Sequence, residues 1–195
     1  TLYDLASLTK VATSTLLTMM TVERGMLDLD APLSTLLPDR EGIVLDEELG
    51  RRTLRDLLAH RSGMPAWIPF YLDLVAHDDT TASALTDTVQ SGWMEVRPGR
   101  WMDPSWCDTI HHRIRTTTPR EPGRYRYSDL GYYLLQEVLE SLWNAPLDRL
   151  ADSLIHAPLG LQRMGHRPLE WSHRADLAPT CLLYTSPSPR DGTKS

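Results

Sequence analysis

The chain has 195 residues, of which 41% are hydrophobic, so it carries enough apolar material for one domain-sized core. It has 20 lysines and arginines against 26 aspartates and glutamates, a net charge of −6 at pH 7. A negative net charge without a basic cluster argues against nucleic-acid binding, because phosphate binding needs locally concentrated lysine and arginine. No apolar run approaches the roughly 18 residues that a membrane-spanning helix needs, so no membrane span is predicted in this chain.

The first predicted element is a helix over residues 5–24. Asp4 is a suitable N-cap, and apolar residues recur with helical spacing as far as Gly25. This spacing predicts that most of the helix is buried. Ser7 and Lys10 lie one turn apart on one face near the helix N-terminus, where free backbone N–H groups favour developing negative charge.

The middle of the chain is predicted to contain short helices joined by loops. A turn after Gly25 leads into a short helix that ends at Pro38, and Thr53 caps a second helix. The further predicted elements are loops over 61–65 and 66–74 and helices over about 80–91 and 104–116.

A loop-to-helix junction is predicted after Pro122 and Gly123. A short alternating stretch follows these residues, and Ser128 or Asp129 can then cap a helix with apolar residues as far as Leu142. The remaining predicted elements are a helix over 147–156 and an irregular stretch over 161–180. Convincing strands are few.

The last fifteen residues, 181–195, differ abruptly from the preceding sequence and resemble the in-frame translation of a sequencing adapter. We exclude them from the predicted fold and expect them to be disordered; the alternative is a natural Ser/Pro-rich linker. Without them Cys107 has no second cysteine, so no disulfide is expected. We expect the natural chain to be truncated at both ends, and we predict that residues 1–180 form a partial domain.

Lysine usage singles out one position. Lys10 and Lys194 are the only lysines, so nearly all of the basic charge is carried by arginine. A desolvated lysine can lose its proton, whereas arginine practically cannot, and a serine hydroxyl becomes an effective nucleophile when a nearby base removes its proton. Ser7 and Lys10 are therefore a candidate nucleophile and base. Ser-x-x-Lys also arises by chance, so the alternative is an ordinary pair on a helix surface.

Two further blocks follow in order, Leu-Leu-Ala-His-Arg-Ser-Gly-Met-Pro over 57–65 and Tyr-Ser-Asp-Leu-Gly-Tyr over 127–132. With residues 5–11, they resemble the serine beta-lactamase-related family, the group of class C beta-lactamases, DD-peptidases and esterases. The resemblance covers essentially all of residues 1–180, with Tyr-Ser-Asp in place of the commoner Tyr-x-Asn. The family's third block, Lys-Thr-Gly or His-Thr-Gly on a late strand, is not found before the tail.

The resemblance implies an α+β fold of the beta-lactamase/DD-peptidase (transpeptidase-like) type, here mainly its helical subdomain with an incomplete antiparallel sheet. It implies a periplasmic or secreted serine hydrolase that uses no cofactor or metal and cleaves an amide, beta-lactam or ester through an acyl-serine intermediate. In that reading Ser7 attacks, Lys10 helps to deprotonate it, Tyr127 shares the acid/base role, and Asp129 contacts the substrate. Which of Lys10 and Tyr127 is the formal base stays open.

The backbone N–H of Ser7 would form an oxyanion hole with an N–H from the absent late strand, so we expect this fragment to be inactive by itself. An alternative function from a different class is a catalytically silent protein of the same fold that binds peptidoglycan-like peptides. The expected partner is a small-molecule or peptide substrate, and the sequence does not indicate an oligomeric state.

Other polar and aromatic residues have simpler interpretations. His60 is predicted to fix its loop by a hydrogen bond. His111 and His112 are predicted to be ordinary helix residues, and no metal site is predicted there. The aromatic residues Trp67, Phe70 and Tyr71 could line a substrate cleft, but packing on the core is favoured.

Overall fold

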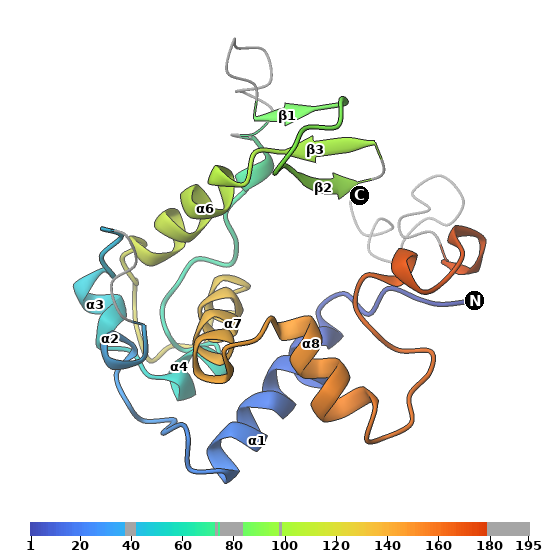
Figure 1. Cartoon of the computed structure of the whole chain (residues 1–195). Coiled ribbons are helices and arrows are strands. Elements are labelled where there is room, and N and C mark those ends of the chain that lie inside the picture. Colours follow the sequence, from blue (N-terminus) through green and yellow to red (C-terminus); the bar gives the residue numbers. More distant parts are fainter. Residues whose placement is uncertain (38–41, 73, 75–83, 98, 179–195) are drawn as a thin grey trace, which may run out of the picture. The chain divides into compact units, whose positions relative to one another are not determined.

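The computed structural model describes residues 1–37, 42–72, 74, 84–97 and 99–178. The chain forms two compact units, which we describe separately. Unit 1 comprises residues 1–17 and 145–178, and unit 2 comprises the described residues within 18–144. Figure 1 shows that helices predominate among the described elements. The tail 181–195 lies outside the described residues, so both its predicted origin and the single partial domain over 1–180 stay predictions.

The predicted N-terminal helix is present, although it begins later than expected. It consists of a π-helical segment, Lys10–Thr15, and the helix α1, Leu16–Glu23. The Asp4 carboxylate accepts the N–H of Ala6 at 2.8 Å and so stabilises the turn before the helix. Gly25, with φ +68°, follows the helix in the left-handed conformation that glycine adopts without strain.

The prediction that most of this helix is buried is wrong for one of its faces. Leu17 is fully buried, whereas Leu8 and Val11 are each 64% exposed and Met19 is 61% exposed. The helix carries apolar side chains on several sides, and the described residues cover only some of them.

Unit 2 contains the predicted short helices and an additional helix, α3 (Glu47–Gly50), that was not predicted. The loop prediction over 66–74 is wrong for residues 70–72, which are helical. The other helices of this unit after α1 are α2 (Leu33–Leu36), α4 (Leu54–Leu58), α6 (Ser105–Arg115) and α7 (Leu130–Trp143). Thr53 begins α4 as predicted, with a capping box in which Thr53 and Asp56 each bind the other's backbone N–H. The N-cap of the unpredicted α3 is Asp46, whose carboxylate accepts the N–H of Leu49 at 3.0 Å.

Apolar packing between α4 and α7 forms part of the core of unit 2 (Figure 1). Leu57 on α4 and Leu130 on α7 are at most 1% exposed. Gly131 permits a close approach of the two helices, because a Cβ there would lie 3.3 Å from the Leu57 side chain. At the far end of α7, the Trp143 indole N–H donates to the Thr21 hydroxyl at 2.9 Å, which links α7 to α1 within this unit.

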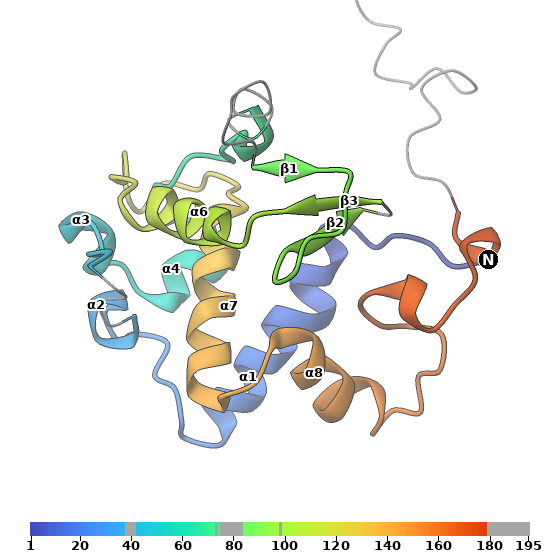
Figure 2. The same cartoon turned by 45° about the horizontal axis from the view of Figure 1, so that its top comes forward.

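A three-stranded antiparallel sheet replaces the helix that was predicted over 80–91. Its strands are β1 (Leu85–Thr86), β2 (Met94–Arg97) and β3 (Arg100–Met102), in the order β1-β3-β2 (Figure 2). The helix prediction is therefore wrong for residues 84–91, and residues 80–83 lie outside the described residues. Thr86 favours a strand, and pairing of Leu85 and Thr86 with β3 decides the conformation of these two residues.

Unit 1 contains α8 (Leu147–Ala151), which continues as a π-helical segment, Asp152–His156, so the predicted helix over 147–156 is confirmed. The described part of the predicted irregular stretch contains only two 3₁₀ turns, Pro168–Glu170 and Arg174–Asp176. A parallel bridge between Leu2 and Leu177 joins the two chain segments of this unit. The chain as a whole is α+β, rich in helices and with a small antiparallel sheet.

An exposed ion pair in unit 2 gives a pH-dependent prediction. The Arg55 guanidinium donates two hydrogen bonds to Asp30, at 2.7 and 2.8 Å, and these bonds lower the pKa of the Asp30 carboxyl. A lowered folded-state pKa means that the pair stabilises the fold above the unfolded-state pKa of about 3.9, and that this stabilisation is lost as the pH falls through the folded-state value.

Asp30→Asn is expected to lower the free energy of unfolding slightly at about pH 7 in low salt and to have no effect at about pH 2. Urea unfolding at both pH values, repeated in about 1 M NaCl, measures the difference. If Asp30→Asn lowered the free energy of unfolding by the same amount at both pH values, the ion pair with Arg55 would not be the cause.

Candidate active site

The Ser7 and Lys10 side chains meet at the start of the N-terminal helix. The Lys10 ammonium donates to the Ser7 hydroxyl, with 3.2 Å between Nζ and Oγ. Ser7 is exposed and Lys10 is half-buried. The preceding residue, Ala6, has φ +44°, an unusual backbone conformation for a residue with a side chain. The Ser7 hydroxyl thus lies beside an amine at the positive end of a helix.

The Tyr-Ser-Asp block lies in unit 2, at the start of α7. The Ser128 N–H donates to His60 Nδ1 at 3.2 Å, and the Ser128 hydroxyl donates to the Pro65 carbonyl at 2.6 Å. The Asp129 N–H donates to the Ala66 carbonyl at 2.8 Å. Three hydrogen bonds therefore fasten this block to the loop over 60–66.

The structure also distinguishes the two predicted caps of α7. Asp129 occupies the N-cap position without a side-chain capping bond, whereas the Ser128 hydroxyl accepts the N–H of Leu130 at 3.2 Å. The side chain of Asp129 therefore takes no part in capping this helix. Its predicted role in substrate binding stays a prediction.

The Tyr127 ring packs on the imidazole of His60. The two ring centroids are 4.4 Å apart, the ring planes are inclined by 36°, and Tyr127 is 40% exposed. The predicted hydrogen bond that fixes the His60 loop is confirmed, since His60 accepts the N–H of Ser128. Sequence spacing could not show that this loop contacts the candidate tyrosine.

Gly63 is essential to the same loop for steric reasons. Its φ is +83°, and a Cβ at this position would lie 2.5 Å from the carbonyl oxygen of Arg120. The Gly63 carbonyl in turn accepts the Arg120 N–H at 2.8 Å. The two backbones therefore approach too closely for a side chain between them.

Gly63→Ala is expected to lower the free energy of unfolding by about 2 kcal/mol or more, because it adds a left-handed alanine and a backbone clash. Gly92→Ala is the matched control, since Gly92 has φ +82° but no atom within 4 Å of the added Cβ. Urea unfolding should show the larger loss for Gly63→Ala. Equal losses would show that the clash contributes nothing.

The predicted site residues fall into two groups. Ser7 and Lys10 lie together in unit 1, and Tyr127 and Asp129 lie in one block of unit 2. The catalytic roles of all four residues stay predictions.

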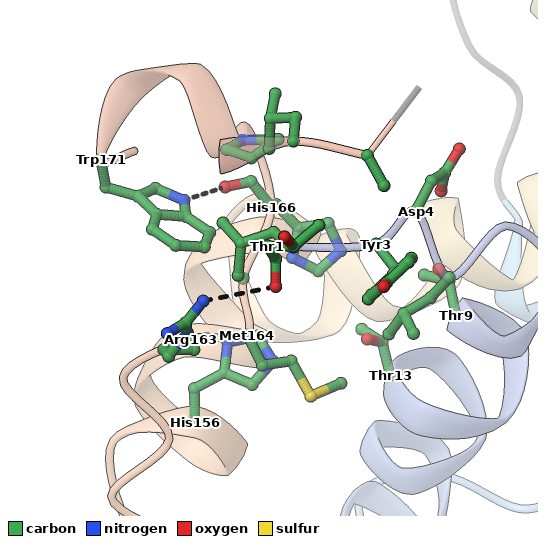
Figure 3. Close-up of a pocket in the computed structure, with 16 residues that line it drawn as sticks. Thr1, Tyr3, Asp4, Thr9, Thr13, His156, Arg163, Met164, His166 and Trp171 are labelled. Carbon is green, nitrogen blue, oxygen red and sulfur yellow. Dashed lines mark hydrogen bonds between the residues drawn. The ribbon is translucent and has the colours of Figure 1, made fainter. Parts of the chain in front are cut away.

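Unit 1 also contains a cavity of about 750 Å³ that sequence reasoning missed (Figure 3). Its walls come from residues near the beginning of the chain and from the segment 156–178, and they carry no recognisable motif. His156 and His166 line it, whereas Ser7 and Lys10 do not. The His156 ring is oriented by a 2.8 Å hydrogen bond between its Nδ1 and the Asp152 carboxylate.

Several other predicted features can be placed. His111 Nδ1 lies 3.8 Å from a carboxylate oxygen of Glu137 on α7, a neighbour that sequence spacing did not indicate. Trp67 and Tyr71 are more than half exposed, so the predicted packing on the core is wrong for these two. Within the described ranges, no cluster of three metal-ligating side chains occurs, and no helix is both long and apolar enough to cross a membrane.

Comparison with known proteins gives consistent matches. A family model described as beta-lactamase matches residues 1–176. A Salmonella agona protein provisionally named D-alanyl-D-alanine carboxypeptidase is 29% identical over 172 residues, which are 87% of this chain and 35% of that protein. A relative from Salmonella typhimurium is 28% identical over the same length. The chain thus spans about a third of these relatives.

Two solved structures are similar in fold. The octameric penicillin-binding protein homologue from Pyrococcus abyssi matches with a TM-score of 0.58 and 23% identity, over 88% of this chain and 34% of that one. A class C beta-lactamase from Rhodobacter sphaeroides matches with a TM-score of 0.53 and 24% identity, over 82% of this chain and 35% of that one. The fold expected from the sequence is thereby confirmed.

Proposed function

Because this chain belongs to the beta-lactamase family, a family of hydrolases, we propose that its parent protein cleaves an amide, beta-lactam or ester bond through an acyl-serine intermediate. The observation that carries the proposal is the 3.2 Å hydrogen bond between Lys10 Nζ and Ser7 Oγ at the start of a helix. A hydroxyl in contact with an amine can pass its proton to that amine when the amine is neutral.

In the proposed reaction, Ser7 Oγ attacks the carbonyl carbon of the substrate while its proton passes to neutral Lys10. The backbone N–H of Ser7 donates to the developing oxyanion. The bond to the leaving group then breaks, and Tyr127 relays the proton from Lys10 to that group, which leaves Lys10 neutral. In the second half of the cycle, neutral Lys10 takes a proton from water as the water attacks the acyl carbon. The bond between that carbon and Ser7 Oγ breaks, the proton returns to Ser7 Oγ, and the acid is released, while Asp129 contacts the bound substrate.

The chain spans about a third of its relatives, so these steps are proposed for the whole protein. We propose that this chain by itself has no appreciable activity, because a second oxyanion donor would come from a strand beyond it. Export to the periplasm or the exterior is proposed from the family resemblance. Fractionation of cells that produce the full-length protein tests the location.

The proposed function is tested by incubating the full-length protein separately with a fluorophosphonate and with penicillin, followed by intact-mass measurement. We expect one covalent adduct, which Ser7→Ala abolishes. Ser105→Ala is the matched control, because Ser105 is an exposed serine at the start of α6. It should leave the adduct unchanged.

Each outcome decides between stated alternatives. In a parallel assay, hydrolysis of aryl esters without reaction with penicillin would identify an esterase. The absence of an adduct with either reagent, in a folded full-length protein, would reject the acyl-enzyme proposal in favour of a silent peptide-binding protein. Rapid labelling of the present chain alone would contradict its proposed inactivity.

A further inference from the structure

We propose that His60 is a positioning residue for the Tyr127 phenol, an inference that rests on the proposed role of Tyr127 in proton transfer. The first observation is the contact between the two rings, with centroids 4.4 Å apart and planes inclined by 36°. Aromatic rings at such a separation attract each other beyond the simple burial of their area. The imidazole therefore favours one orientation of the phenol ring.

The second observation is that both neighbours of Tyr127 are bonded to His60. The Ser128 N–H donates to His60 Nδ1 at 3.2 Å, and the Arg126 N–H donates to the His60 carbonyl at 2.8 Å. The main chain on each side of Tyr127 is thus tied to one residue. A rotation of the Tyr127 backbone that redirects its side chain would have to break one of these bonds.

The structure also determines the tautomer and the position of the His60 imidazole. Because Nδ1 accepts a hydrogen bond from Ser128, the proton of the neutral ring is on Nε2. The ring also faces Tyr132, with centroids 5.5 Å apart, and meets Tyr125 edge to face at 6.1 Å. The ring on which Tyr127 packs is therefore a fixed surface.

The backbone of His60 gives a third, independent observation. Its φ is +54°, in the left-handed region that glycine enters without strain and that side chains enter at a cost. Other contacts of His60 have to offset that cost. They include its hydrogen bonds with the N–H groups of Arg126 and Ser128 and the packing of its ring on Tyr127. A strained residue next to a candidate catalytic group is consistent with a functional constraint.

A positioning role and a general packing role make different predictions. If His60 acts through Tyr127, its removal slows catalysis only while Tyr127 has a hydroxyl to misplace. If His60 merely stabilises the fold, its removal has the same effect whether or not that hydroxyl is present. A double-mutant cycle separates the two roles.

The experiment measures acylation rate constants and KM of the full-length protein, with an activated ester, for His60→Asn, Tyr127→Phe and the double variant. Asparagine tolerates a positive φ but has no ring for Tyr127 to pack on. We expect His60→Asn to slow acylation about 10- to 100-fold with little change in KM, as for a misplaced catalytic group. In the Tyr127→Phe background the further loss should be less than about threefold.

Controls keep folding and function apart. His112→Asn makes the same substitution at an exposed position on α6. Tyr133→Phe removes the hydroxyl of a half-exposed tyrosine on α7. Both variants should leave the acylation rate constants unchanged. Thermal unfolding confirms that each variant is folded. If His60→Asn does not fold, His60→Gly, which adopts a positive φ without strain and has no ring for Tyr127 to pack on, is measured in both backgrounds by the same criterion.

Equal losses in the two backgrounds, or an unchanged rate in His60→Asn, would overturn the positioning role while leaving the acyl-serine mechanism intact. A Tyr127→Phe variant with the wild-type rate would instead overturn the proposed role of Tyr127, and the role of His60 with it. Failure of the acyl-serine mechanism itself would appear separately, as the absence of a Ser7-dependent adduct.

Discussion

Lys10→Arg in the full-length protein is expected to lower the rate constant for acylation of Ser7 by about 10²- to 10⁴-fold. Arginine keeps the positive charge and can still donate to the Ser7 hydroxyl, which Lys10 Nζ contacts at 3.2 Å. It cannot accept the hydroxyl proton, because a guanidinium does not deprotonate in a protein. Stopped-flow measurement of acylation with an activated ester provides the rate constant.

The matched comparison is Lys10→Gln, which removes both the charge and the base. If Lys10 acts as a base, the two variants should be similarly slow. If its positive charge alone were needed, Lys10→Arg would retain most of the rate and only Lys10→Gln would be slow. Near-wild-type acylation by Lys10→Arg would therefore exclude lysine as the base and leave Tyr127 as the remaining candidate.

Local sequence signals predicted α4 and α7. The Thr53 cap and the apolar periodicity of α7 both depend on residues only a few positions apart in the sequence. They can therefore be recognised without knowledge of the tertiary structure. The exposed side of the N-terminal helix was not predicted, because exposure of Leu8 and Val11 depends on which other segments are present to cover them.

The small sheet could not be predicted for a similar reason. β1 contains only two residues, and its conformation follows from pairing with β3, where Leu85 lies opposite Met102. Strand propensity depends on such cross-strand neighbours more than on the residue itself. A two-residue strand carries too little alternation to be distinguished from a helix by periodicity.

The candidate site likewise contains one contact that is local in sequence, which was predictable, and one tertiary contact, which was not. Ser7 and Lys10 are three positions apart on a helix, so their contact follows from helical geometry. His60 and Ser128 are joined across the tertiary fold, and each lies in a loop or junction without a regular period. The sequence therefore indicated that His60 forms a hydrogen bond without identifying its partner.

A buried ion pair between α6 and α7 escaped sequence reasoning altogether. Arg115 is 2% exposed and donates to Glu137 through Nη2 at 2.8 Å and through Nε at 3.3 Å. The Glu137 side chain is 13% exposed, so neither charge has much access to water. The carbonyl of Arg115 also accepts the Asp46 N–H at 2.8 Å, so its backbone joins α6 to the start of α3.

Arg115→Ala is expected to lower the free energy of unfolding by about 3 to 5 kcal/mol, because it leaves the Glu137 carboxylate buried without its main counter-charge. Arg115→Met combined with Glu137→Gln removes both charges and should restore much of that loss, since desolvating the two charges offsets most of their attraction. Urea unfolding followed by circular dichroism measures all three proteins. A double variant as unstable as Arg115→Ala would show that the lost packing of the arginine stem, and not the unpaired carboxylate, dominates the effect.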